Sequence, residues 1–211
     1  LEALRDFQAI AASAGATRPV AVATAAMRDA SNSALFTERI RRELGISIDI
    51  IGGLKEARYG FAGAVRGVEA SNGLLFDLGG GSMQVTRFAQ RKMESAVSLP
   101  LGALRVSEKF LDSDPPTKKQ LRHLRHLVLK QLTKAGISRL ARGHVLVGTG
   151  GTVRNLAKID REARHYPIRS LHGYELPVDR LGDVVDRLAS AKRKRRDEIS
   201  GLRAERADSV L

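Results

Sequence analysis

The sequence has no cysteine and no tryptophan, and its aromatic residues are six Phe and three Tyr among 211 residues. The lack of cysteine excludes a disulfide scaffold, a cysteine nucleophile and a thiolate metal site. No apolar run approaches the about 20 residues needed to cross a bilayer, and no apolar leader follows a basic segment. With 43% hydrophobic and 28% charged residues, the chain can still bury a core. We therefore expect a soluble, cytoplasmic, globular protein with no membrane partner.

Acidic side chains are scarce in the second half of the chain, which concentrates the net charge of +13 there. Residues 1–117 carry 14 basic and 13 acidic side chains, whereas residues 118–211 carry 22 and 10. Residues 118–169 alone hold 13 basic and 2 acidic side chains. Such a field favours an anionic partner, with a solvated helix face as the alternative. Nucleic acid is disfavoured as that partner, because the few aromatic residues are not interleaved with the basic runs.

Apolar periodicity of the helical type and of the strand type alternates along the chain, which predicts an α/β fold. The expected helices are 1–14, 32–44, 55–67, 118–135, one that begins at 153, and 179–188. The expected strands are 19–24, 46–51, 73–77, 83–88 and 144–147. The third and fourth strands are expected to form a hairpin, because a glycine loop joins them. Asp112–Thr117 contains two prolines and reads as a linker.

Two glycine-rich loops are candidates for binding an anion. Asp77–Ser82 (DLGGGS) joins two expected strands, and its glycines lack a Cβ, so the backbone can turn sharply and present N–H groups to a phosphate. We expect Gly80 to adopt dihedral angles that a β-branched residue cannot. Asp77 ends a buried strand and could hold a cation beside that phosphate. Gly148–Thr152 (GTGGT) runs from a strand into a helix, whose N-terminus favours anions.

Neither loop fits the GxxxxGK[ST] pattern, because no lysine follows the glycines, or the GxGxxG pattern, because the last glycine is missing. The alternative for each loop is a tight turn that binds no ligand. Six blocks in order nevertheless resemble the motifs of the exopolyphosphatase/guanosine pentaphosphate phosphohydrolase family. The blocks are Ala23–Asn32, Ile51–Arg58, Asp77–Ser82, Ser98–Ala103, Val147–Ala157 and Gly201–Asp208. The resemblance implies an actin-like ATPase (ribonuclease H-like) fold with two lobes, which we expect at residues 1–52 and 53–211.

The resemblance also implies hydrolysis of the terminal phosphate of inorganic polyphosphate or guanosine pentaphosphate with a divalent cation, usually Mg²⁺. Glu56 is then the candidate general base, which orients and deprotonates a water molecule. Arg28 could clamp a phosphate through its planar guanidinium, or pair with Asp29 or Glu56. Asp77 is the candidate metal ligand. The candidate phosphate-binding residues are Arg28, Gly79, Gly80, Gly81, Ser82, Gly148, Gly150, Gly151 and Thr152.

The chain departs from the family pattern at two positions. Gln84 stands where the family usually has Glu, and Lys55 replaces the first of two carboxylates. Each change removes negative charge near the expected metal, which favours a non-catalytic sensor of polyphosphate or of guanosine phosphates as the alternative function. We also expect the family fold to be incomplete at both ends, because an N-terminal phosphate loop is absent, and this segment alone to be inactive. A homodimer is a further expectation.

Overall fold

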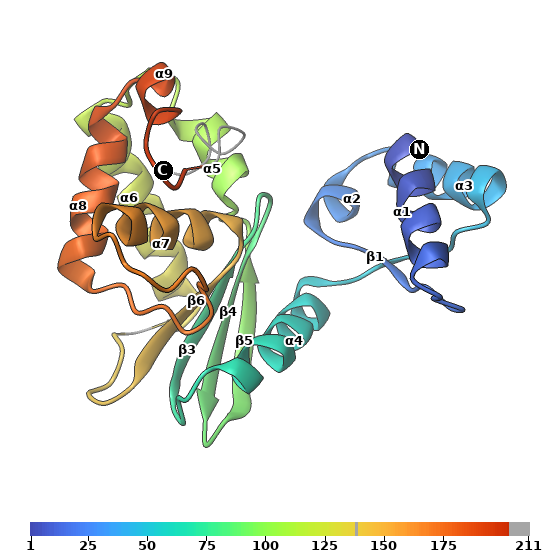
Figure 1. Ribbon diagram of the computed structural model, residues 1–211, viewed down its shortest axis with the longest axis horizontal. Helices are drawn as coiled ribbons and strands as arrows, with labels where there is room; N and C mark the ends of the chain where they lie inside the picture. Colours follow the sequence, from blue (N-terminus) through green and yellow to red (C-terminus); the bar gives the residue numbers. More distant parts are fainter. Residues whose placement is uncertain (138, 203–211) are drawn as a thin grey trace. The chain divides into compact units, whose positions relative to one another are not determined.

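The computed structural model describes residues 1–137 and 139–202. The chain divides into two compact units, Leu1–Glu56 and Ala57–Leu211, and Figure 1 labels their helices and strands. The division falls within helix α4 (Gly53–Ala64). The lobe boundary expected at residues 52 and 53 stays a prediction.

The first unit contains a two-stranded parallel sheet and three helices. In chain order its elements are α1 (Glu2–Ser13), β1 (Ala21–Ala23), α2 (Ala25–Asp29), α3 (Ser33–Leu44) and β2 (Ile48–Ile50). Ala21 pairs with Ile48 and Ala23 with Ile50. Helix α3 ends at Gly45 in the left-handed conformation, because glycine pays no Cβ penalty there. Two large apolar side chains of α1 are exposed, Phe7 at 65% and Ile10 at 63%.

The second unit is built on a four-stranded sheet with the order β5-β4-β3-β6. Its strands are β3 (Gly73–Leu78), β4 (Met83–Ala89), β5 (Lys92–Leu99) and β6 (Val145–Thr149). Strands β3 and β4 pair antiparallel, which confirms the expected hairpin, and β6 pairs parallel with β3. Strand β5, which was not among the expected strands, pairs antiparallel with β4. The mixed sheet agrees with the expected α/β class.

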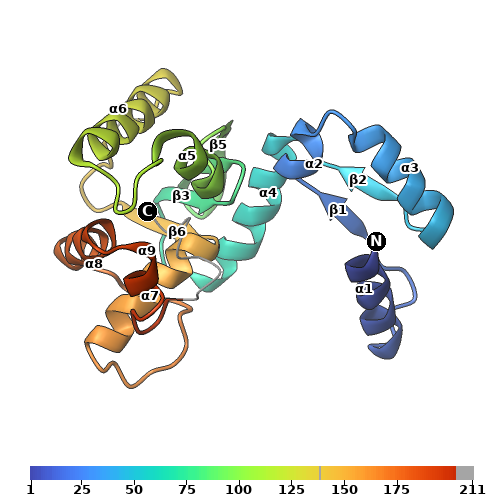
Figure 2. The same ribbon diagram turned by 90° about the horizontal axis from the view of Figure 1, so that it is seen from above.

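Helices cover both faces of this sheet. After α4 come η1 (Val65–Gly67), α5 (Ala103–Phe110), α6 (Lys118–Lys134), α7 (Gly151–Ala163), α8 (Val178–Ser190) and α9 (Arg193–Arg196). Phe61 of α4 packs on Leu75 and Phe88 of one face. Val106 of α5 and Leu124 of α6 pack with Leu99 of the other face. Figure 2 shows the course of α4, α5 and α6 around the strands. Alternate strand residues therefore point to two separate cores.

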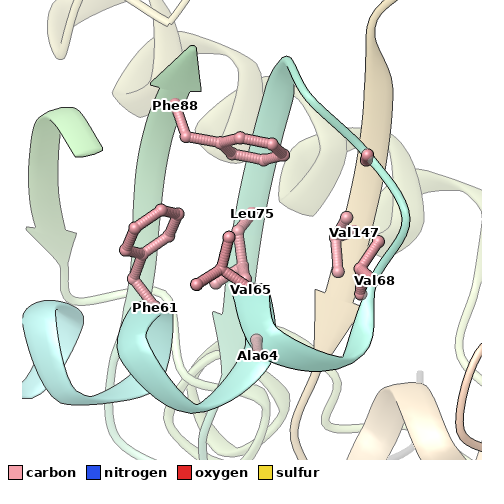
Figure 3. Close-up of a pocket in the computed structure, with 8 residues that line it drawn as sticks. Phe61, Ala64, Val65, Val68, Leu75, Phe88 and Val147 are labelled. Carbon is pink, nitrogen blue, oxygen red and sulfur yellow. The ribbon is translucent and has the colours of Figure 1, made fainter. Parts of the chain in front are cut away.

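A small pocket lies between α4 and the sheet, and Figure 3 shows its lining. Its walls are side chains such as Phe61, Val65, Leu75 and Val147. Because the lining is apolar throughout, this pocket belongs to the hydrophobic core and offers no partner to an anion.

Candidate functional site

A row of polar residues crosses the sheet of the second unit at one end. The strand register pairs Asp77 with Thr149 on one side and with Gln84 on the other. Gln84 in turn pairs with Ser98 of β5. Residues paired across strands point to the same face, so one residue from each of the four strands contributes to this row. The first glycine loop joins Asp77 to Gln84 along the chain, and the second contains Thr149.

The loop Gly79–Ser82 is held by the start of helix α5. The amides of Ala103 and Arg105 donate to the carbonyls of Gly79 (2.9 Å) and Gly80 (3.0 Å). The guanidinium Nε of Arg105 donates to the carbonyl of Gly81 at 2.7 Å. Among residues 1–137 and 139–202, the Gly80 and Gly81 amides donate no hydrogen bond to the chain. The loop therefore commits its acceptors to α5 and leaves two donors for an anion.

Close packing explains why residue 102 is a glycine. A Cβ built on Gly102 would lie 2.3 Å from the carbonyl oxygen of Gly80. Such a contact is far inside van der Waals range, so any other residue would push the loop off α5. Gly102 lies in the family block Ser98–Ala103, but nothing in the sequence marks it, or Arg105, as a residue that supports the loop. Their signal is tertiary, because they hold a loop about 20 residues earlier in the chain.

The expectation that Gly80 needs glycine dihedral angles is wrong. Among the loop glycines only Gly150 has a positive φ, of 99°. A Cβ on Gly80 would lie 3.8 Å from the Cβ of Leu104, which is ordinary contact. The fold therefore accepts a side chain at Gly80, and only a ligand approaching the loop backbone requires its absence.

The second loop, Gly148–Thr152, lies beside the first. Gly150 caps the N-terminus of α7, and a Cβ there would lie 2.3 Å from the carbonyl oxygen of Leu78 and 3.1 Å from Oδ1 of Asp77. Asn155 donates to the carbonyl of Gly151 at 2.8 Å and steadies the first turn. Thr152 is buried in that turn. The structure thus brings both loops to Asp77, which the sequence analysis had associated with the first loop alone.

Asp77 is the acidic member of the polar row. Its carboxylate is half-buried, with Oδ1 near Gly150 and Oδ2 3.5 Å from the position of a Cβ on Gly60. Among the described residues no three His, Cys, Asp or Glu side chains form a metal-binding group. One carboxylate still suits Mg²⁺, because that ion commonly binds through one or two carboxylates, water and phosphate oxygens.

Gln84 connects the polar row to the first loop. Its side chain is 2% exposed, and Nε2 donates to Oγ of Ser82 at 2.9 Å and to Oγ of Ser98 at 3.1 Å. Ser82 is itself 5% exposed. The two hydrogen bonds use both protons of the amide nitrogen. Ser98 begins a family block, but its contact with Gln84 could not be predicted from the sequence.

In the first unit, Arg28 and Glu56 pair with each other. The Arg28 guanidinium lies 3.4 Å from Oε2 of Glu56 and donates to the carbonyl of Ile51 at 2.8 Å. Both side chains are partly buried. Of the two interpretations of Arg28, the pairing with Glu56 is present in the structure. The role of Arg28 as a phosphate clamp stays a prediction.

The basic residues of the second unit fall into two kinds. On α6 the charged side chains Lys118, Lys119, Arg122 and Arg125 are exposed, while Leu124 faces the core. Arg196, in the cluster Lys192–Arg196, is different. It is 5% exposed and lies 2.9 Å from Oδ1 of Asp114. Arg196 is therefore a structural residue, although it stands in a run of five cations.

Comparison with known proteins decides the family. The model of the Ppx/GppA phosphatase family matches residues 1–211. The chain belongs to the Ppx/GppA phosphatase family. This membership confirms the resemblance carried by the sequence blocks. The last block, Gly201–Asp208, falls mostly outside the described residues.

Curated Ppx/GppA relatives include exopolyphosphatase 1 of Mycobacterium leprae, which is 31% identical over 214 residues. That match covers 98% of this chain and 62% of the relative. Exopolyphosphatase 2 of Mycobacterium tuberculosis is 31% identical over 217 residues, covering 99% of this chain and 67% of the relative. The chain thus spans between 62% and 67% of the length of these two relatives.

Solved structures share the fold. A Ppx/GppA enzyme from Aquifex aeolicus has a TM-score of 0.80 at 26% identity and covers all of this chain and 70% of its own. An exopolyphosphatase from Cytophaga hutchinsonii has a TM-score of 0.88 at 24% identity, over 99% of this chain and 69% of its own. These matches confirm the expected α/β, actin-like fold class. Within the described ranges, no helix is long and apolar enough to span a membrane.

Proposed function

We propose that the protein of which this chain forms part is an exopolyphosphatase that removes terminal phosphates from inorganic polyphosphate. The observation that carries the proposal is the meeting of two glycine loops at Asp77, with the carbonyls of the first loop held by α5. Family membership and the exopolyphosphatases among the relatives support the same substrate. Guanosine pentaphosphate is the second substrate we propose, since its terminal phosphate presents the same chemistry.

The proposed roles follow the chemistry of each group. The free amides of Gly80 and Gly81 and the N-terminus of α7, including Thr152, bind phosphate oxygens. Asp77 would hold a divalent cation, for which we propose Mg²⁺, and such a cation would supply positive charge beside the phosphoryl oxygens. Arg28 binds a phosphate in addition to orienting Glu56.

Glu56 is proposed as the general base for a single displacement. It takes one proton from a water molecule while the water oxygen forms a bond to the terminal phosphorus. The bridging P–O bond breaks, and its electron pair stays on the bridging oxygen, which becomes the new end of the shortened chain. The products are inorganic phosphate and a polyphosphate with one phosphate fewer. Such transfers depend mainly on positioning and electrostatic stabilisation.

A second candidate is a sensor that binds polyphosphate or guanosine phosphates without hydrolysis. Two positions with less negative charge than the family pattern favour it. The neutral amide of Gln84 lies beside Asp77. Lys55, whose Nζ lies 2.6 Å from Asp49 Oδ2, leaves Glu56 as the acidic residue of its block. Under either candidate we propose a cytoplasmic protein, and a homodimer remains part of the proposal.

Phosphate release separates the two candidates. The full-length protein is incubated with polyphosphate, and separately with guanosine pentaphosphate, in Mg²⁺ or in EDTA, and inorganic phosphate is measured over time. An enzyme releases phosphate in Mg²⁺ and much less in EDTA. Saturable binding of polyphosphate without release under either condition would replace the enzyme with the sensor.

A further inference from the structure

The hydrogen bonds of Gln84 fix the direction in which a loop hydroxyl can donate. A serine hydroxyl has one proton and can accept through its oxygen lone pairs. Since Nε2 of Gln84 donates to Oγ of Ser82 at 2.9 Å, the Ser82 proton has to point away from the amide. The second bond, to Oγ of Ser98 at 3.1 Å, uses the other amide proton and holds the side chain in this orientation.

Burial makes this orientation firm. Gln84 is almost completely buried. It lies on β4 between two neighbouring strands, opposite Asp77 of β3 on one side and Ser98 of β5 on the other. A buried amide that lost its acceptors would forfeit hydrogen bonds without gaining water, so rotation away from the two serines is costly. The amide is therefore a fixed donor beneath the loop.

We propose that Gln84 is a positioning residue that holds the Ser82 hydroxyl as a hydrogen-bond donor for an oxyanion at the Gly79–Ser82 loop. This inference deepens the proposed function and rests on it. The hydroxyl adds a third donor to the amides of Gly80 and Gly81, so the loop recognises phosphate oxygens. A carboxylate at residue 84 would reverse the polarity, because it only accepts hydrogen bonds.

The reversed polarity has two consequences. With a carboxylate at residue 84, the Ser82 proton would turn toward it, and the oxygen lone pairs would face the loop, where they suit a cation. The new negative charge would also lie directly across the β3–β4 pair from Asp77, where it repels an anion and attracts a metal ion. The identity of residue 84 thus sets the balance between oxyanion and cation affinity.

The test measures binding of inorganic triphosphate, and separately of Mn²⁺, by calorimetry on the full-length protein without turnover. Gln84→Met removes both donors at similar volume, and Ser82→Ala removes the hydroxyl. Each is expected to weaken triphosphate binding about tenfold, the value of one hydrogen bond to a charged ligand, with Mn²⁺ affinity within about twofold of the parent. The double variant is expected to lose about tenfold in total, because both changes remove the same donor.

Gln84→Glu is expected to weaken triphosphate at least as much and to bind Mn²⁺ more tightly. Thr86→Val is the matched control, since Thr86 is buried on the same strand and face, and its hydroxyl has no hydrogen-bond partner within the described ranges. That variant should bind both ligands as the parent does. Circular dichroism verifies folding, and if Gln84→Met does not fold, Gln84→Glu and Ser82→Ala decide.

Parent-like triphosphate affinity in the Gln84 variants, or losses that multiply to about a hundredfold in the double variant, would overturn the role of Gln84 alone. A parent protein that binds no triphosphate would overturn the proposed function as well.

Discussion

Substitution of the two loop glycines by alanine separates a backbone requirement from a ligand requirement. At Gly150 an alanine meets φ 99° and ψ 170°, a region that is nearly restricted to glycine and costs about 1–3 kcal/mol for other residues. Its Cβ would also lie 2.3 Å from the Leu78 carbonyl oxygen, so the backbone must shift, at a further cost of about 1–3 kcal/mol. We expect Gly150→Ala to lower the free energy of unfolding by about 3 kcal/mol or more.

At Gly80 the same change meets no such obstacle. The added Cβ lies 3.8 Å from the Cβ of Leu104, and φ is not positive. Gly80→Ala should leave the free energy of unfolding within about 1 kcal/mol of the parent, because a compatible alanine also restricts the unfolded chain. We nevertheless expect it to weaken phosphate binding, because a methyl group beside the Gly80 amide leaves less room for an anion.

Urea denaturation followed by circular dichroism measures both effects. With a slope of about 2 kcal/mol per molar urea, Gly150→Ala lowers the midpoint by about 1.5 M and Gly80→Ala changes it by at most about 0.5 M. Calorimetry with inorganic triphosphate then tests binding by Gly80→Ala. The reasoning is refuted if both variants lose equal stability, or if Gly80→Ala binds triphosphate as tightly as the parent.

Three further predictions concern stability, pH and charge. Asp160 is fully buried, and its carboxylate binds Arg180 at 2.9 Å and the Tyr174 hydroxyl at 2.7 Å. Because Arg180 is partly exposed, we expect Asp160→Asn to lower the free energy of unfolding by only about 2 kcal/mol in urea titrations. An unchanged urea midpoint would contradict this prediction. Partial burial and the hydrogen bond to Asp160 raise the pKa of Tyr174 above its usual 10, so its contribution to folding stability is present below pH 10 and is lost as pH rises through the raised value. Urea midpoints should therefore fall less steeply between pH 8 and 11 in Tyr174→Phe than in the parent. The same pH dependence of the midpoint in both proteins would argue against this role. The third change replaces four exposed cations of α6 by Gln, namely Lys118, Lys119, Arg122 and Arg125. It should weaken the binding of long polyphosphate far more than that of guanosine pentaphosphate, and make polyphosphate binding less dependent on salt. Equal losses for both ligands would show that these charges act by general steering, and no loss for either would show that they form a solvated face.

The sequence predicted those parts of the fold whose signals are local. The hairpin from Gly73 to Ala89 was found because its strands are apolar and its turn is glycine-rich. Helix α6 was found from its periodicity, and its Thr117–Gln120 capping box confirms where it starts. Strand β5 was missed because Lys92, Glu94 and two serines dilute its apolar pattern, and because the turn before it has Gln90 and Arg91, not glycine, at positive φ.

The candidate site was predicted in part for the same reason. Glycine loops and Asp77 stand out in the sequence, and their meeting follows from the pairing of β3 with β6. The supports of the first loop do not stand out, because Gly102 and Arg105 act through contacts with residues far away in the chain. Arg196 stands in a run of five cations, and its burial depends on a contact with Asp114, which is distant in sequence.

Phosphate release from polyphosphate, measured for the full-length protein and for its Glu56→Gln variant, tests whether Glu56 is the general base of an exopolyphosphatase. Polyphosphate binding is measured in parallel, so that loss of chemistry is distinguished from loss of affinity. We predict steady phosphate release by the parent in Mg²⁺. In Glu56→Gln the rate of release should fall by a factor of about 100 or more while polyphosphate binding is retained, because a positioned general base contributes at least that factor. Equal release by the two proteins, or binding by the parent with no release, would contradict it.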